Sequence, residues 1–200
     1  MAEGDLRQYQ RKGPNDATRI LLAAVRQHAP GAATLLDIGS GVGVIAHELL
    51  QDGVRQATVV DMSRAYLAAA RSEAERRGTA GRTRFVHGDF VAVSDGLEPA
   101  DVVTAERVVC CYPDGERLLA TAAARCTVAL ALSYPRDVWY VRAVIALENL
   151  VRRLRGKAFR TFVHPVGVVR GTLERGGLRR VFSEDTVVWR VEVYVRNGRF

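Results

Sequence analysis

Three glycines alternate with other residues immediately after a short apolar segment. The apolar segment covers residues 33–38, and the glycines are Gly39, Gly41 and Gly43. A second apolar pattern, at helical spacing, follows over residues 42–51, so the glycines stand between a buried strand and a helix. Glycine at such a junction permits a tight turn and lets a ligand approach the backbone closely. This feature predicts an α/β sheet with a ligand site where its first strand ends.

The remaining chain repeats this alternation of short apolar strands with amphipathic helices. The predicted strands cover residues 33–38, 57–60, 85–86, 101–105, 127–133, 178–182 and 187–195. The predicted helices cover residues 14–28, 42–51, 63–77, 116–125, 138–154 and 166–174. Ser63 is expected to cap the third of these helices. Because only the last two strands follow each other without a helix, we expect an antiparallel hairpin there. The alternation of strands and helices in the preceding part of the chain predicts a doubly wound, mostly parallel sheet covered by helices on both faces.

The length and composition fit one globular domain. The chain has 200 residues, of which 48% are hydrophobic, and this excludes a disordered or collagen-like protein. No apolar run approaches the roughly 18 residues of a membrane-spanning helix. The acidic, polar start does not resemble a secretory signal. We expect a single domain over residues 1–200, in which residues 1–30 form an N-terminal arm and helix and residues 134–165 a helical lid insert.

The chain is strongly basic, with a net charge of +7 and a pI near 9.8. Such a charge suggests a nucleic-acid partner. However, the 29 basic residues include only two lysines, and the arginines are dispersed among many alanines, valines and glycines. A base-composition bias of the source genome explains this pattern. We therefore expect no stable nucleic-acid partner.

The cysteines and histidines indicate neither a disulfide framework nor a zinc site. Cys110, Cys111 and Cys126 form no CxxC pair, and the four histidines are scattered. An odd number of cysteines, two of them adjacent, is typical of a protein from a reducing compartment. The sequence therefore predicts a cytoplasmic protein without a metal.

Acidic residues stand at the ends of the first three predicted strands. Asp37 lies two residues before the first glycine, where it can meet a cationic group but is badly placed for a pyrophosphate. Asp61 ends the second strand, where a carboxylate can accept both hydroxyls of a ribose. Asp89 follows the third strand, where an acid can accept from an adenine amino group, and Phe90 beside it can cover the ring. The alternative is that Asp61 and Asp89 are helix caps or turn residues.

The combination of Asp37-x-Gly39-x-Gly41-x-Gly43 with Asp61 and Gly88-Asp89-Phe90 resembles class I S-adenosylmethionine-dependent methyltransferases over nearly the whole chain. The resemblance implies a Rossmann-like, seven-stranded sheet with an antiparallel last strand. It implies S-adenosylmethionine as cofactor and S-adenosylhomocysteine as product. The expected cofactor-binding residues are Asp37, Gly39, Ser40, Gly41, Gly43, Asp61, Met62, Asp89, Phe90 and Glu106.

The resemblance also implies separate roles for these residues. Gly39 and Gly41 line the methionine end, Asp37 faces its ammonium group, Asp61 holds the ribose and Asp89 reads the adenine. Two apolar residues, Met62 and Phe90, are expected to flank the adenine ring. A dinucleotide-dependent oxidoreductase is disfavoured, because Val44 stands where the GxGxxG fingerprint requires a third glycine.

The loop after the fourth strand faces the methyl group in this family. Tyr112-Pro113 after that strand, the long segment 133–160 and Phe162-Val163-His164-Pro165 are similar in layout to magnesium-protoporphyrin O-methyltransferases. Cys111 stands where that family tends to have His, so the similarity suggests a small-molecule enzyme with a helical lid rather than a porphyrin substrate. The substrate-side candidates are Arg107, Cys111, Tyr112 and His164.

Two of these residues are candidates for catalysis. His164 can act as a general base, since histidine titrates near pH ~6.5, and Tyr112 is the second candidate. A histidine before a proline is also an ordinary loop residue.

Two further segments bear on the site. The insert carries apolar residues at helical spacing over 144–154 and a basic cluster over 152–160, which usually means a core-facing stripe and solvated charges. The alternative is a lid with a basic rim for a carboxylate-bearing substrate or an anionic membrane surface. Near the N-terminus, Tyr9 and Lys12 are expected to lie close to the cofactor when the arm orders over it.

The expected function is methyl transfer from S-adenosylmethionine to an O, N or S nucleophile of a small molecule. The alternatives are an RNA or protein methyltransferase and a non-catalytic cofactor-binding protein of the same fold. The sequence leaves the methyl acceptor and the oligomeric state open.

Overall fold

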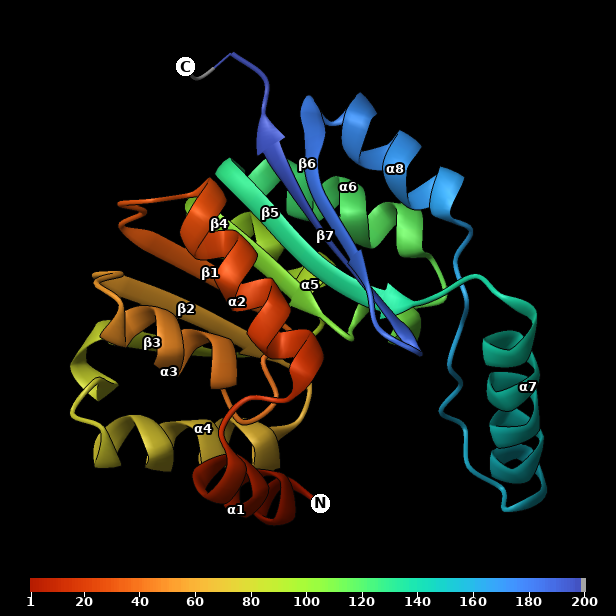
Figure 1. The fold of residues 1–200 in the computed structure, drawn as a ribbon. Coiled ribbons are helices and arrows are strands. Elements are labelled where there is room, and N and C mark those ends of the chain that lie inside the picture. The colour runs from red at the N-terminus through yellow and green to blue at the C-terminus, as the bar shows by residue number, and fades with distance from the viewer. Residues whose placement is uncertain (199–200) are drawn as a thin grey trace.

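A seven-stranded sheet forms the centre of the protein, with strand order β3-β2-β1-β4-β5-β7-β6 (Figure 1). The computed structural model describes residues 1–198. The strands are β1 Thr34–Ile38, β2 Gln56–Asp61, β3 Thr83–His87, β4 Ala100–Glu106, β5 Cys126–Pro135, β6 Leu178–Asp185 and β7 Trp189–Arg196. Among the described strands, β7 runs opposite to the other six and pairs antiparallel with both β5 and β6. The predicted mostly parallel, seven-stranded sheet with an antiparallel last strand is thereby confirmed.

Eight α-helices accompany the described strands. They are α1 Ala2–Lys12, α2 Asp16–His28, α3 Val44–Gln51, α4 Arg64–Arg76, α5 Phe90–Val93, α6 Gly115–Arg125, α7 Trp139–Leu154 and α8 Val166–Arg175. The six helices predicted from apolar spacing are present, with ends that differ by up to two residues. Ser63 caps α4 as predicted, since its hydroxyl accepts a hydrogen bond from the Tyr66 backbone N–H at 3.3 Å.

The sheet divides two hydrophobic cores, because successive strand residues point to opposite faces. In β1, Leu35 packs with α2, α3 and α4, whereas Leu36 and Ile38 pack with α5, α6 and α8. The same alternation recurs in β5 at Ala129 and Leu130. Figure 1 shows the resulting three layers of helix, sheet and helix.

The N-terminal arm is helical, which sequence periodicity did not predict. Helix α1 carries only a narrow apolar stripe, because most of its residues are polar or charged. Its Ala2, Leu6 and Tyr9 pack against Val42 and Ala69, from the glycine-rich turn and α4. Tertiary packing therefore stabilises a helix whose own sequence signal is weak.

The apolar stripe of α7 is exposed to solvent. Of the two interpretations of this segment, the core-facing stripe is wrong, because only Val141 of this helix is buried. Leu147 and Leu154 are 63% and 79% exposed. Figure 1 shows α7 standing apart from the sheet, joined to it by extended segments.

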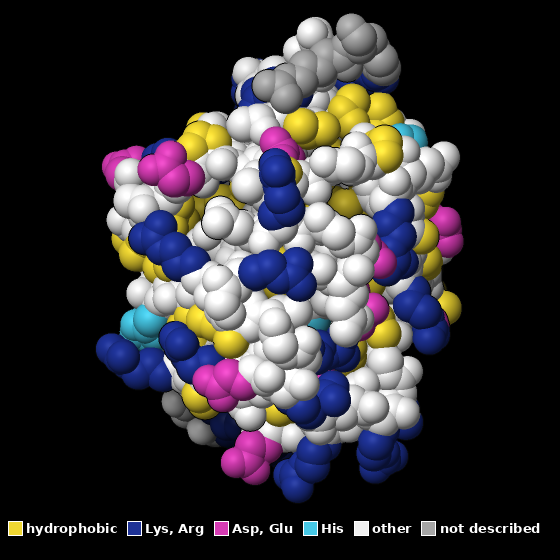
Figure 2. All heavy atoms as spheres, turned by 90° about the vertical axis from the view of Figure 1, so that its left-hand side faces the viewer, with side chains coloured by type: hydrophobic (Ala, Val, Ile, Leu, Met, Phe, Trp, Pro, Cys, Tyr) yellow, Lys and Arg dark blue, Asp and Glu magenta, His cyan; other side chains and the backbone are white. Residues whose placement is uncertain are grey.

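Basic side chains are dispersed on the face seen in Figure 2, where acidic and uncharged groups lie between them. Many arginines pair with neighbouring carboxylates, such as Arg26 with Asp52 at 2.7 Å and Arg190 with Asp185 at 2.7 Å. The high positive charge therefore does not gather into a single basic surface on that face.

None of the described helices combines the length and the apolar character needed to cross a membrane.

Candidate active site

The carboxyl ends of four parallel strands bring the predicted acidic residues to one edge of the sheet. Asp37 lies near the end of β1, Asp61 ends β2, Asp89 follows β3 and Glu106 ends β4. Because β3, β2, β1 and β4 are consecutive neighbours in the sheet, these four residues line a continuous row. This edge is where open α/β sheets bind their ligands.

The glycine-rich turn needs glycine for two separate reasons. Gly39, Gly41 and Gly43 have φ values of +66°, +54° and +78°, in the left-handed region that favours glycine. Gly39 is also crowded, since a Cβ there would lie 2.5 Å from Cγ2 of Val108. A Cβ at Gly41 would meet nothing within 4 Å, and this open space adjoins the strand ends.

Asp61 holds the glycine-rich turn in place. Its Oδ2 accepts a hydrogen bond from the Gly41 N–H at 2.9 Å, and its Oδ1 accepts one from the Ser63 N–H at 2.7 Å. The side chain therefore joins β2 to both the turn after β1 and the start of α4. These two hydrogen bonds are compatible with the prediction that Asp61 binds a ribose, because each carboxylate oxygen can accept a further hydrogen bond.

We expect Asp61→Ala to weaken S-adenosylmethionine binding by roughly tenfold to a hundredfold, because charge-assisted hydrogen bonds contribute about 1.5–3 kcal/mol each. Isothermal titration calorimetry measures this directly. A matched control is Asp52→Ala, which removes an exposed carboxylate paired with Arg26 at the opposite end of α3. Wild-type affinity in the Asp61 variant would rule out its role in the site.

Asp37 is a buried carboxyl group with one unpartnered oxygen. Its exposure is 2%, its Oδ1 accepts a hydrogen bond from the Thr104 hydroxyl at 2.7 Å, and its Oδ2 has no partner. Burial raises the pKa of Asp37 to about 7, against the opposing effect of the Thr104 hydrogen bond. A cationic group would restore the ionised form by pairing with Oδ2. The neighbouring Ser40 hydroxyl is buried and unpartnered as well.

Asp89 has a structural role in addition to its predicted one. Its Oδ1 accepts from the Val91 N–H at 3.0 Å and so caps α5, which was the alternative interpretation. The Tyr112 hydroxyl also donates to Asp89 Oδ2 at 3.0 Å. The Phe90 ring is only 4% exposed and packs in the hydrophobic core, so its burial does not support the prediction that it covers adenine. Met62 is 70% exposed beside this edge.

Tyr112 and His164 make contacts that suit positioning better than proton abstraction. Burial, followed by the hydrogen bond to Asp89, raises the pKa of Tyr112, so its phenol stays protonated and acts as a donor. His164 Nε2 lies 3.1 Å from the carbonyl oxygens of both Val109 and Tyr112, which requires the proton on Nε2. His164 therefore fastens the segment before α8 to the loop after β4. These contacts give no support to the general-base assignments.

The chain turns sharply after β4. Arg107 has φ +52° and is the only non-glycine residue in the described chain with a positive φ. Its N–H donates to the Ser133 carbonyl at 3.0 Å, and its guanidinium lies 5.8 Å from the centre of the Trp189 ring. Glu106 pairs with Arg107 at 3.4 Å and accepts a hydrogen bond from Thr18 of α2 at 2.5 Å. The turn places Val108 directly over the glycine-rich turn.

The two adjacent cysteines differ in exposure. Cys111 is exposed on the substrate-side loop, whereas Cys110 is buried, and their sulfur atoms are 3.9 Å apart as free thiols. The contact with the Cys111 sulfur, followed by burial, raises the pKa of Cys110, so that thiol stays protonated. Of this pair, Cys111 alone is exposed to meet a substrate.

Helix α1 packs beside the glycine-rich turn and is held by polar contacts. The Tyr9 hydroxyl donates to Glu48 at 2.5 Å, and the Gln10 amide donates to Glu73 at 2.8 Å. Tyr9 is buried and stacks on His47 of α3, while Lys12 is exposed. The predicted arm thus lies against α3 and α4, with the Tyr9 hydroxyl turned to Glu48.

Deletion of residues 1–13 is expected to weaken cofactor binding, because it uncovers Val42 in the glycine-rich turn. Tyr9→Phe is the matched control, since it keeps the packed ring and removes only the hydrogen bond to Glu48. We expect the deletion to lower affinity by roughly tenfold or more and Tyr9→Phe by much less. Equal calorimetric affinities for the deletion and the full chain would contradict a role for α1.

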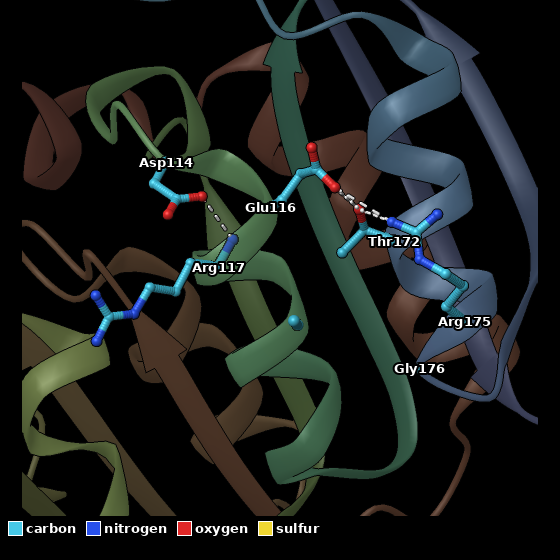
Figure 3. Close-up of a pocket in the computed structure, with 7 residues that line it drawn as sticks. Asp114, Glu116, Arg117, Thr172, Arg175 and Gly176 are labelled. Carbon is cyan, nitrogen blue, oxygen red and sulfur yellow. Dashed lines mark hydrogen bonds and ion pairs between the residues drawn. The ribbon is translucent and has the colours of Figure 1, made fainter.

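A shallow groove of about 470 Å³ lies away from this edge, between α6 and α8. Figure 3 shows its charged lining, in which Arg175 donates to Glu116 at 3.2 Å and Asp114 accepts from the Arg117 backbone N–H at 3.0 Å. Glu116 pairs with Arg175, and Asp114 caps the start of α6 through the Arg117 backbone N–H. None of the residues that line this groove has a buried side-chain polar atom without a partner, in contrast to Asp37.

Sequence reasoning missed the residues that support the site. Thr104 lies directly opposite Asp37 in the β1–β4 pairing, and Val108 covers Gly39. Thr104 has no motif of its own, and only the strand order places it beside Asp37. Among the described residues, no cluster of three or more His, Cys, Asp or Glu side chains forms a metal site.

Comparison with known proteins agrees with this architecture. Residues 35–128 match a family model described as a methyltransferase domain. No curated protein matches the chain by sequence.

The solved structures extend the likeness to the whole fold. A magnesium protoporphyrin IX methyltransferase from Synechocystis PCC 6803 with bound S-adenosylhomocysteine has a TM-score of 0.73 at 18% identity, covering 90% of this chain and 82% of that one. An O-methyltransferase family protein from Burkholderia thailandensis has a TM-score of 0.76 at 17% identity, covering 99% and 59%. An O-methyltransferase family 2 protein from Planctomyces limnophilus DSM 3776, in complex with apigenin, has a TM-score of 0.65 at 18% identity, covering 92% and 63%. The chain therefore has the Rossmann-like fold of class I S-adenosylmethionine-dependent methyltransferases, and residues 35–128 match a methyltransferase domain.

Proposed function

We propose that the protein transfers the methyl group of S-adenosylmethionine to an O, N or S atom of a small molecule. The observation that carries the proposal is the unpartnered Oδ2 of Asp37, buried at the end of β1 beside a glycine-rich turn. A buried carboxyl group with a free oxygen favours a cationic ligand, such as the ammonium of the methionine moiety. The match to a methyltransferase domain supports the same ligand.

The residues present fit this cofactor. Asp37 would pair with the ammonium, the open side of Gly41 would admit the ligand against the backbone, and Asp61 and Asp89 would meet the ribose and adenine. When bound, S-adenosylmethionine supplies a methyl carbon that forms a bond to the acceptor atom as its bond to sulfur breaks and leaves that electron pair on sulfur.

The contribution of the chain is placement and exclusion of water rather than acid–base chemistry. The loop after β4, fixed by His164 and by the Tyr112–Asp89 hydrogen bond, would hold the acceptor in line with the methyl group. Cys111 and Arg107 are exposed or half-exposed on this loop and would contact the acceptor.

A small-molecule acceptor is favoured over a nucleic acid. On the face seen in Figure 2 the basic side chains are dispersed among acidic and uncharged groups, whereas nucleic-acid binding relies on clustered cations. The apigenin in one of the similar structures supports the small-molecule class. An odd number of cysteines, two of them adjacent, favours a reducing compartment such as the cytoplasm.

Calorimetry with S-adenosylmethionine and S-adenosylhomocysteine, followed by transfer of a radiolabelled methyl group, tests the proposal. We expect both ligands to bind and label to enter low-molecular-mass products of a cell extract. Label in RNA or protein would favour those acceptors instead. Binding without any transfer would identify a non-catalytic cofactor-binding protein, and no binding would overturn the proposal.

A further inference from the structure

Helix α7 has two faces of opposite character. On one face, Val141 is buried and the Asn149 side chain donates to the Thr161 carbonyl of the insert at 2.7 Å. The other face carries apolar side chains that are all more than one-third exposed. They are Trp139, Val144, Leu147, Leu150, Val151 and Leu154.

These exposed side chains form one continuous surface. At 100° per residue, Trp139, Leu147, Leu150 and Leu154 project within one half of the helix circumference. Trp139 is 80% exposed and Leu150 is 53% exposed. An apolar stripe of this length on a folded protein marks an interaction surface.

Basic residues border the apolar face. Between positions 142 and 160 the chain has six basic residues and one acidic residue, Glu148. Glu148 is paired with Arg152 at 2.8 Å, so it does not offset the remaining cations. The exposed side chains of Arg153, Arg155 and Lys157 make no hydrogen bond or ion pair within the described part of the chain.

The exposed apolar face and its basic border together indicate the kind of partner that α7 binds. A second copy of the chain would bring a second basic border against the first, and like charges disfavour that contact. An anionic lipid surface instead accepts an apolar helix face, a terminal tryptophan and flanking cations at the same time. Helix α7 is also too short and too charged to cross the bilayer, so it would lie in the plane of the surface.

We propose that α7 docks in the plane of an anionic membrane surface, with Leu147, Leu150 and Leu154 inserted among the acyl chains and Arg153, Arg155 and Lys157 at the lipid headgroups. The proposal does not rest on methyl transfer, since the four acidic side chains of the cofactor edge lie at the ends of β1 to β4 and not on α7. The docking attaches the protein to a membrane reversibly.

Co-sedimentation with vesicles tests the proposal, using phosphatidylcholine alone and phosphatidylcholine mixed with phosphatidylserine. We expect the wild type to bind only the mixed vesicles appreciably and to be released by salt. Leu147→Glu combined with Leu150→Glu should reduce binding roughly tenfold or more, without loss of folding, because both side chains are already exposed.

Charge-reversal variants distinguish the effect of the basic border on vesicle binding from the effect of the net charge of the protein. Arg153→Glu with Arg155→Glu should weaken binding roughly tenfold or more. The matched control, Arg55→Glu with Arg84→Glu, makes the same change in net charge at exposed sites near the starts of β2 and β3, and it should bind almost as well as wild type. Equal losses in the two variants would mean that overall charge, not α7, is responsible, and would overturn the proposal.

Fluorescence gives an independent readout. In Trp189→Phe, Trp139 is the one remaining tryptophan of the chain, and its emission should shift to the blue on vesicle binding. No shift, or no sedimentation of the wild type with anionic vesicles, would also overturn the proposal. A wild-type dimer that Leu147→Glu with Leu150→Glu converts to monomer, without lipid binding, would assign the face to a second copy instead.

Discussion

Asp37→Asn is expected to make the ligand-free protein more stable than wild type above pH 7 and to remove most of its affinity for S-adenosylmethionine. In the wild type, burial raises the pKa of Asp37 to about 7, from an unfolded value of 3.8. The native state therefore binds the proton more tightly than the unfolded chain between pH ~4 and ~7. The stability that this group contributes is complete below this window and is lost as the pH rises through it.

The size of the effect follows from linkage. A shift of about three pKa units corresponds to a loss on the order of 4 kcal/mol in unfolding free energy across this window. Asparagine keeps the acceptor for the Thr104 hydroxyl but does not ionise, so the variant should lack this pH dependence. Urea unfolding of both proteins at several pH values gives the difference between their unfolding free energies. The contributions of the other titrating groups are the same in both proteins and cancel in this difference. Parallel stability curves would contradict the raised pKa.

Ligand binding should show the complementary pH dependence. A cationic ammonium favours the ionised Asp37, so binding releases a proton from the wild type below pH ~7 and tightens as the pH rises. Asp37→Asn should bind roughly 10–100-fold more weakly at pH 8, since it loses a charged partner. Calorimetry in buffers of different ionisation enthalpy measures the number of protons that are released on binding. Wild-type affinity in the variant would remove Asp37 from the site.

Gly39→Ala is expected to destabilise the protein by about 2–5 kcal/mol, because it combines backbone strain with a steric clash. The residue has φ +66°, and the new Cβ would lie 2.5 Å from Cγ2 and 2.8 Å from Cβ of Val108. Since Val108 belongs to the loop after β4, the loop must move and the cofactor edge is deformed. Thermal unfolding and cofactor titration measure the two consequences.

Two other variants distinguish the cost of backbone strain at Gly39 from the cost of the steric clash with Val108. Gly31→Ala has a similar φ of +75° and open space around its Cβ, so it should cost only about 1–2 kcal/mol. Val108→Ala in the Gly39→Ala background removes the Val108 Cγ atoms and should recover part of the loss. If Gly39→Ala costs no more than Gly31→Ala, the contact with Val108 is not important for stability.

The sequence predicted the elements that depend on local patterns. The strand and helix alternation, the cap at Ser63, and the glycines with positive φ follow from apolar periodicity and turn chemistry, which act between near neighbours. The antiparallel last strand was predictable as well, because β6 and β7 have no helix between them. Helix α1 was not, since its few apolar residues acquire partners only when α4 and the glycine-rich turn pack against them.

The candidate site was predicted as a row of strand ends, but its internal contacts were not. The sequence by itself determined that Asp37, Asp61 and Asp89 end neighbouring strands beside a glycine-rich turn. Only the tertiary structure decided that Thr104 lies opposite Asp37, that Phe90 enters the core, and that the apolar face of α7 is exposed. Periodicity reports which residues share a face, whereas the partner of that face depends on strand order and on contacts between residues far apart in the chain.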